Sequence, residues 1–366
     1  MRLFMRLTAR PAVVVLLALS FGGRAAAVEV TYLHGLADFS GTVPYNDARL
    51  HVDGERDEVY AAVGNSVRVF NSAGMEIHRF DLDPASGSIQ DLAVEASGDI
   101  LLLTLVPPGA GVGGAWFILR CDYRGEPIGR VSITGLPPEL ASFTPGVMGL
   151  DAGRIVLVSM SDSRALVADR SGAFRRAYDL AGLAGIADAD RRKHGLAGFG
   201  IGPGGDMLFT IPTLFRAFDL SPEGALRTFG RPGSVAGTFG VIAGIAADNW
   251  GHVLVADMLR GVVMIFDRDL EFVSEFGVGA DDRGGLVRPA DLAVGPSGKV
   301  YVTQTRDRGV AVFRLESGGG AERGDAEPLA SGGAGENGKS SNEPGRDGTG
   351  VSPAAGRPIE LPAGPS

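Results

Sequence analysis

Short runs of apolar residues recur along the chain between about residue 50 and residue 315, separated by polar turns that contain glycine. The stretch V-L-V-A-D-M-L-R-G-V-V-M-I-F-D at 253–267 holds two such runs joined by a short polar link. This pattern predicts two antiparallel strands. An isolated hairpin cannot bury its apolar faces, so these strands must belong to a larger sheet.

The same pattern occurs six times. The first apolar residue of the equivalent run is Val59, Ile100, Ile155, Met207, Val253 and Val300. A short apolar strand precedes each run, a third strand follows it, and a fourth usually comes after a turn that resembles D/N-x-x-G. Four short antiparallel strands in every roughly 40–55 residues predict the blades of a β-propeller.

The sixth repeat lacks a fourth strand, because the chain enters a glycine-rich segment after Leu315. The segment V-E-V-T-Y-L-H-G-L-A-D-F at 28–39 resembles a fourth strand and belongs to no other repeat. We therefore predict an all-β, six-bladed propeller over residues 28–316. Its N-terminal strand completes the sixth blade and leaves no open edge between blades.

Two of the repeats carry a family resemblance. The run G-H-V-L-V-A-D-M-L-R-G-V-V-M-I-F-D and the run P-A-D-L-A-V-G-P-S-G-K-V-Y-V resemble NHL repeats, and the resemblance extends over roughly 30–316. It implies a six-bladed propeller like those of bacterial, extracytoplasmic NHL proteins. Relatives of these propellers include lyases that bind a metal through histidines and lactonase-like enzymes with acidic metal ligands.

The two ends of the chain differ from the repeats. Residues 1–27 combine three early arginines, an apolar run and a final A-A-A, which predicts a signal peptide. Residues 317–366 are rich in Gly, Pro, Ser and Glu and contain no aromatic residue, which predicts a disordered tail. We expect a periplasmic or secreted protein with no transmembrane segment in the mature chain.

Charge and cysteine content narrow the functional classes. The formal net charge is −9, although the first 27 residues alone carry four arginines. An acidic mature chain is a poor ligand for nucleic acid or anionic lipid. The single cysteine, Cys121, excludes an intrachain disulfide and occupies a position that is Phe in four other repeats, so we expect a buried, inert thiol.

A polar cluster is predicted at one mouth of the central channel. When the repeats are aligned, the innermost strands begin at Arg49, Asp91, Val147, Gly198, Gly244 and Asp291. In a closed ring Arg49 lies between Asp91 and Asp291. The cluster either closes the channel as a set of ion pairs or binds a polar ligand or cation.

An enzyme at this mouth is the alternative function. It would use Asp91 and Asp291 with His51 from the same inner strand as Arg49, and this set could hold Ca²⁺. Arg49 opposes a cation there, and the chain contains no G-x-S-x-G or phosphate-binding loop. We therefore expect no catalytic residues, no metal and no cofactor, with Ca²⁺ as the alternative.

The loops between the second and third strands offer a second candidate surface. They combine charged and apolar residues: Asp162, Arg164, Leu214, Phe215, Asp257, Met258, Arg260, Arg306 and Arg308. Mixed surfaces of this kind suit protein recognition, although the arginines could equally tie blades together. We expect a monomeric, non-catalytic binding scaffold whose partner is another extracytoplasmic or cell-surface protein.

Overall fold

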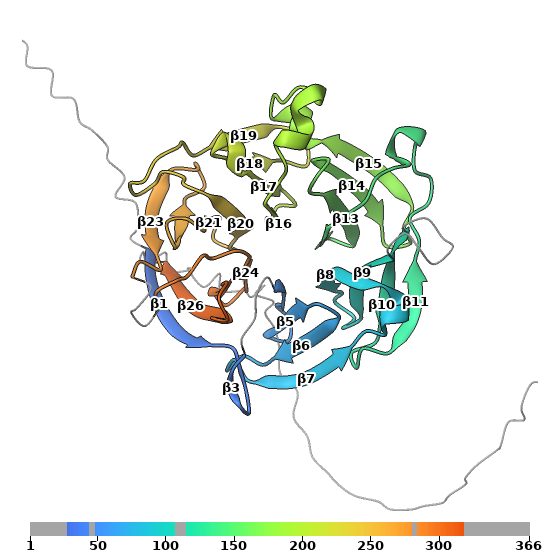
Figure 1. The fold of residues 1–366 in the computed structure, drawn as a ribbon, viewed down its shortest axis with the longest axis horizontal. Helices are drawn as coiled ribbons and strands as arrows, with labels where there is room; N and C mark the ends of the chain where they lie inside the picture. Colours follow the sequence, from blue (N-terminus) through green and yellow to red (C-terminus); the bar gives the residue numbers. More distant parts are fainter. Residues whose placement is uncertain (1–27, 44–47, 107–114, 280–283, 318–366) are drawn as a thin grey trace, which may run out of the picture. The chain divides into compact units, whose positions relative to one another are not determined.

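The computed structural model describes residues 28–43, 48–106, 115–279 and 284–317. They lie in one compact unit, Met1–Gly319. The predicted signal peptide falls outside the described residues, and so does the predicted tail 317–366 except for Ser317, which is the last residue of a strand. Six antiparallel sheets of four strands form a ring around a central channel, which confirms the predicted propeller (Figure 1).

Each sheet is one blade, numbered here in chain order and written from the innermost strand outward. Blades 1 to 3 contain β4 (Arg49–Asp53), β5 (Glu58–Val63), β6 (Ser66–Phe70), β7 (Glu76–Asp81); β8 (Ser88–Val94), β9 (Ile100–Val106), β10 (Ala115–Cys121), β11 (Pro127–Val131); β12 (Val147–Asp151), β13 (Arg154–Ser159), β14 (Arg164–Asp169) and β15 (Phe174–Asp179). Blades 4 to 6 contain β16 (Gly198–Ile201), β17 (Met207–Ile211), β18 (Arg216–Leu220), β19 (Leu226–Phe229); β20 (Ile242–Ala247), β21 (Val253–Asp257), β22 (Val262–Phe266), β23 (Phe272–Phe276); β24 (Leu292–Val294), β25 (Lys299–Thr303), β26 (Val310–Ser317) and β1 (Val28–Gly35).

The sixth blade is closed by the N-terminal strand, as the sequence predicts. β1 pairs antiparallel with β26 from Val28↔Ser317 to Gly35↔Ala311. The strand is shorter than the predicted 28–39, because the chain turns away after Gly35. It then forms a small hairpin of β2 (Ala37–Asp38) and β3 (Gly41–Thr42).

Burial explains why these sequences form these strands. The second strand of blade 5, β21, is buried at every residue, because neighbouring blades cover both of its faces. The outermost strand of blade 1, β7, alternates between half-buried and exposed residues, as expected for a strand covered on one face. The third and fourth strands meet at tight turns, where a side chain such as that of Asp122 accepts the N–H groups of Arg124 and Glu126.

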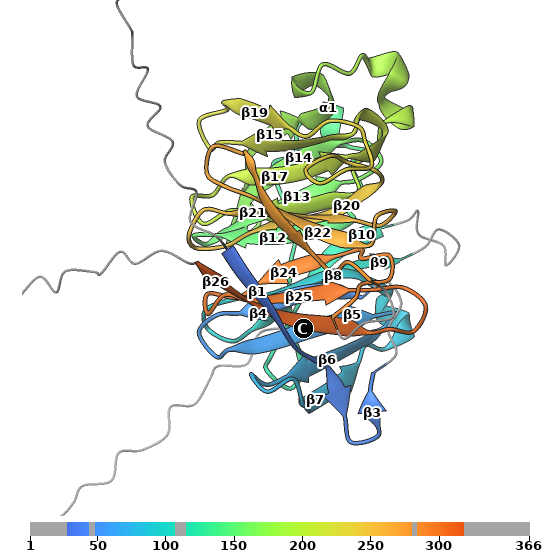
Figure 2. The ribbon, with the colours of Figure 1, turned by 90° about the vertical axis from the view of Figure 1, so that its left-hand side faces the viewer.

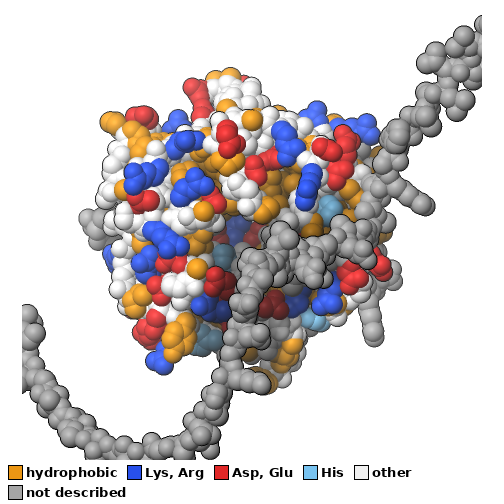
Figure 3. Space-filling model, turned by 180° about the vertical axis from the view of Figure 1, so that it is seen from behind, with side chains coloured by type: hydrophobic (Ala, Val, Ile, Leu, Met, Phe, Trp, Pro, Cys, Tyr) orange, Lys and Arg blue, Asp and Glu red, His pale blue; other side chains and the backbone are white. Residues whose placement is uncertain are grey.

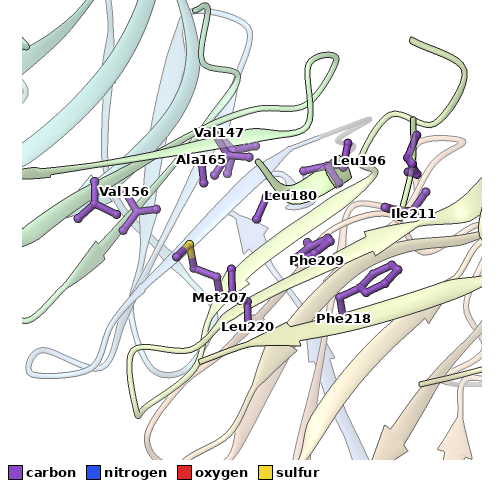
Figure 4. Close-up of a cluster of buried hydrophobic side chains, with 14 residues drawn as sticks. Val147, Val156, Ala165, Leu180, Leu196, Met207, Phe209, Ile211, Phe218 and Leu220 are labelled. Carbon is purple, nitrogen blue, oxygen red and sulfur yellow. The ribbon is translucent and has the colours of Figure 1, made fainter. Parts of the chain in front are cut away.

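The hydrophobic core is divided into six clusters, each lying between two neighbouring blades. Figure 4 shows the cluster between blades 3 and 4, where Phe209 and Phe218 stack with ring centroids 4.8 Å apart. Each blade therefore depends on both neighbours for its burial. Cys121 is fully buried in the cluster between blades 1 and 2, and burial raises the pKa of its thiol to about 11.

Two elements project from opposite sides of the ring in both ribbon views (Figures 1 and 2). One is the β2–β3 hairpin between blades 6 and 1. The other is the connection between blades 3 and 4, which carries α1 (Leu180–Leu183) and the 3-10 helix η3 (Asp188–Lys193). The remaining 3-10 helices are η1 (Pro84–Ser86), η2 (Pro138–Leu140) and η4 (Pro212–Leu214). Within the described ranges no helix has the length and apolarity needed to cross a bilayer.

Candidate functional site

The structure brings the three predicted mouth residues together. Arg49, Asp91 and Asp291 line one cavity of about 220 Å³ in the central channel, with His51 further along the same inner strand. The cavity is also lined by inner-strand residues of the other blades, including Val147, Phe199 and Ile245. It is therefore the channel itself, with its charged side chains supplied by blades 6, 1 and 2.

Both carboxylates accept backbone N–H groups from the next blade. Asp91 is buried, and its side chain accepts the N–H groups of Leu92 at 2.9 Å and of Met148 in blade 3 at 2.8 Å. Asp291 accepts the N–H groups of Leu292 at 3.0 Å and of Leu50 in blade 1 at 3.3 Å. These bonds connect inner strands that share no backbone ladder.

Burial dominates the electrostatics of the mouth. It raises the pKa of Asp91 to about 7 and raises that of Asp291, while the nearby Arg49 acts in the opposite direction on both. Burial also lowers the pKa of His51 to about 4, so its imidazole is neutral at neutral pH.

The predicted cluster is not a set of close ion pairs. Among the described residues, no ion pair of 4.0 Å or less joins Arg49 to either aspartate. Nor does a hydrogen bond between described side chains join His51 to a carboxylate. In the described part of the chain no three His, Cys, Asp or Glu side chains are grouped closely enough to hold a metal ion. Asp91 and Asp291 therefore hold neighbouring inner strands together, and the half-buried guanidinium of Arg49 faces the small polar cavity.

On the opposite side of the channel the inner strands meet through glycine. A Cβ on Gly198 would lie 2.2 Å from the carbonyl oxygen of Ala243, and one on Gly244 would lie 2.6 Å from that of Ala290. The Gly244 N–H donates to Ala290 at 2.7 Å. Neighbouring inner strands are thus joined in two ways. In blades 4 and 5 glycine lets the two backbones approach closely, and in blades 2 and 6 an aspartate side chain bonds to the next strand.

The loops between second and third strands open on the same side as the channel mouth, because the first residues of the inner strands pair with the last residues of the second strands. We call this side the loop face. The other side, seen from behind in Figure 3, mixes basic and acidic side chains in small groups.

Two of the predicted loop residues have structural roles. The Asp257 carboxylate is fully buried and accepts the N–H groups of Gly240, Val241, Leu259 and Arg260. Arg260 is largely buried, pairs with Glu275 at 2.6 Å and donates to the carbonyl of Thr238. Arg260 is therefore structural, but it fixes blade 5 and the segment that leads into it, whereas the sequence-based alternative was a tie between neighbouring blades.

The remaining predicted loop residues are spread over blades 3 to 6. In blade 3 Arg164 donates to the carbonyl of Glu139, and Asp162 accepts from Arg191 through its own carbonyl. In blade 6 Arg306 is exposed, and Arg308 donates to the carbonyl of Gly285. Leu214 packs against the core between blades 3 and 4, while Met258 is half-buried.

Apolar side chains are exposed on the loops of blades 4 and 5. Phe215 is 37% exposed, Val241 is 42% exposed and Leu259 is 73% exposed. Leu259 and Val241 belong to adjoining segments, because the Met258 N–H donates to the Val241 carbonyl at 2.8 Å. We call these three residues the loop-face patch. Sequence reasoning selected Phe215 but chose Met258 and Arg260 over their exposed neighbour Leu259.

Phe215 is also held in an unusual conformation. Its backbone is left-handed, with φ 52° and ψ 44°, at the end of η4. A bulky side chain in this region costs about 1–2 kcal/mol. The loop is fixed by the core packing of Leu214 and by a 2.8 Å hydrogen bond between Thr213 and His194. The strained turn therefore presents an aromatic ring to solvent.

The closed ring of six four-stranded blades around a central channel defines the fold as a six-bladed β-propeller. The human protein "NHL-repeat-containing protein 4" is 31% identical over 125 residues, which cover 31% of this chain and 88% of the relative. The chain belongs to the NHL-repeat proteins, as its repeats indicate. No family model matches the sequence.

Solved structures share the fold. A luciferin-regenerating enzyme aligns with a TM-score of 0.51 at 12% identity, covering 79% of this chain and 95% of that one. Regucalcin from Agrobacterium tumefaciens, a calcium-binding protein, aligns with a TM-score of 0.50 at 14% identity, covering 77% and 95%. At these identities the similarity concerns the fold alone.

Proposed function

We propose that this protein is a non-catalytic scaffold that binds another protein through its loop face. The observation that carries the proposal is the loop-face patch: three exposed apolar side chains on the loops of two adjacent blades. One of them, Phe215, is held in a strained turn. Aromatic and aliphatic side chains of this kind form the centres of protein interfaces.

The channel mouth supports the non-catalytic part of the proposal. The carboxylate oxygens of Asp91 and Asp291 accept hydrogen bonds from backbone N–H groups, and His51 is not hydrogen-bonded to either carboxylate. A catalytic histidine is normally oriented by a second hydrogen-bonded side chain, and among the described side chains neither aspartate plays that part for His51. The enzyme alternative predicts instead that a lyase or hydrolase activity is abolished by Asp91→Asn while the fold is retained.

The test is affinity capture from native envelope and culture-medium extracts, with the full-length chain as bait. Phe215→Ser and Leu259→Ser are compared with Ile128→Ser, which removes an apolar side chain of intermediate exposure, 56%, from β11 of blade 2. We expect one partner to be recovered by the wild type and the control. Its affinity should fall about tenfold for each patch variant. Equal recovery by all four baits would contradict the proposal.

We further propose that the protein acts outside the cytoplasm, on the strength of the N-terminal sequence pattern. The mature chain should then begin near Val28 in the periplasm or the medium. N-terminal sequencing of protein purified from fractionated cells checks this, and an intact Met1 in the soluble cytoplasmic fraction would contradict it.

A further inference from the structure

The guanidinium of Arg49 lies at the channel mouth without a partner among the described residues. It is half-buried and lines the cavity of about 220 Å³, but it forms no ion pair and no side-chain hydrogen bond within the described ranges. A guanidinium carries five N–H donors, and burying them without acceptors is costly. Pockets for drug-sized ligands hold roughly 300–1,000 Å³, so a ligand that pairs with Arg49 in this cavity is small.

Asp291 places an acidic group beside Arg49. It is half-buried and lines the same cavity; burial raises the pKa of its carboxylate, and the positive charge of Arg49 acts against this rise. Each oxygen of Asp291 accepts one backbone N–H, from Leu292 and from Leu50, and keeps a second lone pair. The two charges are near each other without forming an ion pair, so each can bind a group of the opposite charge.

The other titratable groups of the mouth contribute less charge. Burial raises the pKa of Asp91 to about 7, so this carboxyl group is about half protonated at neutral pH, and its side chain is only 6% exposed. Burial lowers the pKa of His51 to about 4, so its imidazole is neutral. Arg49 and Asp291 are therefore the groups at the mouth that are best placed to bind a charged ligand.

The wall opposite these charges is apolar. Phe199 and Ile201 of β16 are half-buried and line the cavity. Both lie over Gly149 of blade 3, because a Cβ on this glycine would be 2.6 Å from the Ile201 Cδ1 and 3.8 Å from the Phe199 Cε1. Blade 4 lies across the ring from blade 1 (Figure 1). The channel thus has a charged side and an apolar side that face each other.

We propose that this cavity binds a free α-amino acid with an apolar side chain. The ligand carboxylate pairs with Arg49, its ammonium group pairs with Asp291, and its side chain lies against Phe199 and Ile201. A simple carboxylate would be repelled by Asp291, and a simple amine would be repelled by Arg49. A zwitterion pairs with both. The site is separate from the loop-face patch, so the two proposals can fail independently.

The first test is isothermal titration calorimetry of the full-length wild-type chain at about pH 8, where Asp91 is mostly ionised. The probes are leucine, methionine and phenylalanine. Three analogues of leucine are compared with them: 4-methylpentanoate lacks the ammonium group, 3-methylbutylamine lacks the carboxylate, and glycine lacks the apolar side chain. We expect at least one of the three amino acids to bind. If leucine binds, each analogue should bind at least about tenfold more weakly, because it loses a charge-assisted hydrogen bond or the buried side chain.

Variants assign each half of the ligand to its partner. Arg49→Gln should weaken leucine binding at least about tenfold and remove the preference for leucine over 3-methylbutylamine. Asp291→Asn should remove the preference over 4-methylpentanoate, while its remaining oxygen still accepts the Leu50 N–H. The control is Arg175→Gln, which removes a 63% exposed arginine from the outer strand of blade 3 and should bind leucine like the wild type.

Several results would overturn the proposal. One is that none of the three amino acids binds the wild type at millimolar concentration. Another is that 4-methylpentanoate or 3-methylbutylamine binds as tightly as leucine, which would define a site for a simple anion or cation. A third is that Arg49→Gln binds leucine like the wild type, or that the control loses binding equally. Thermal unfolding shows whether each variant is folded. Because the analogue series uses the wild-type chain, it decides the proposal even where a variant does not fold.

Discussion

The closest approach between inner strands gives the sharpest stability prediction. Replacing Gly198 by alanine would place a Cβ 2.2 Å from the Ala243 carbonyl oxygen and 2.9 Å from the Gly244 Cα. All of these atoms belong to backbone, so no rotamer change can relieve the contact. The inner strands of blades 4 and 5 would have to separate.

The magnitude follows from two contributions. Overpacking of a rigid interior costs about 1–3 kcal/mol, and a contact this short with backbone belongs at the upper end. Separation would also break a chain of hydrogen bonds, in which the Gly198 N–H donates to the Thr210 hydroxyl at 2.8 Å and that hydroxyl donates to the Ala243 carbonyl at 2.7 Å. Losing one such bond adds about 1 kcal/mol. We expect Gly198→Ala to reduce the free energy of unfolding by about 3–4 kcal/mol.

Gly129 provides the matched control. It also lies in a strand, β11, but a Cβ there would meet nothing within 4 Å. Urea unfolding followed by circular dichroism should give a midpoint near that of the wild type for Gly129→Ala and a much lower midpoint for Gly198→Ala, with an unchanged slope. Equal midpoints for the two variants would refute the claim that blades 4 and 5 meet through backbone at the channel.

Three further predictions concern titration, reactivity and pairing. Burial raises the pKa of Asp91 from 3.8 to about 7, against the pull of Arg49, so the folded chain retains a proton that the unfolded chain has lost. The stabilisation that this proton gives the fold is fully present below about pH 4. It is lost as the pH rises to 7, which lowers the free energy of unfolding by up to about 4 kcal/mol. Urea midpoints at pH 4.5 and 7.5 should show this loss for the wild type and a smaller one for Asp91→Asn; parallel pH profiles would contradict it. The buried thiol of Cys121 should react with a thiol reagent only at the rate at which the protein unfolds, and rapid labelling of the native protein would show that its core is open. Arg260→Glu should destabilise the fold by about 3–5 kcal/mol in thermal unfolding, because it leaves Glu275 buried beside a like charge. If the variant unfolds like the wild type, the ion pair does not stabilise the fold, and Arg260 is again a candidate for partner recognition.

The fold could be predicted because the same pattern of strands and turns occurs six times along the sequence. Each blade has a middle strand covered on both faces, such as β21, whose uninterrupted apolar run marks it in the sequence. The closing role of β1 followed from counting strands, since one blade lacked a fourth strand and one strand lacked a blade. Alignment of the repeats likewise placed Arg49 between Asp91 and Asp291.

The details of the candidate sites depend on contacts that no repeat pattern contains. Arg260 occupies a loop in the sequence, but its partners Glu275 and Thr238 lie in other segments that the fold brings beside it. Leu259, its neighbour, is left exposed by the same arrangement. Phe39 was taken for the end of a strand. Only the turn made by Asp38 and Ser40 places it at a projecting tip.

The pairing of β1 with β26 also affects how the protein is made. Gly35 and Ala311, which face each other in the closed ring, are separated by roughly 280 residues of chain. At roughly 5–20 residues per second, the ribosome needs about 14–55 s to deliver the second strand after the first. During that time five blades can form, but the first strand has no partner and the ring has two unpaired sides. The closed ring therefore cannot form before the whole of β26 is available, and until then the unpaired N-terminal strand is the part most exposed to wrong pairing.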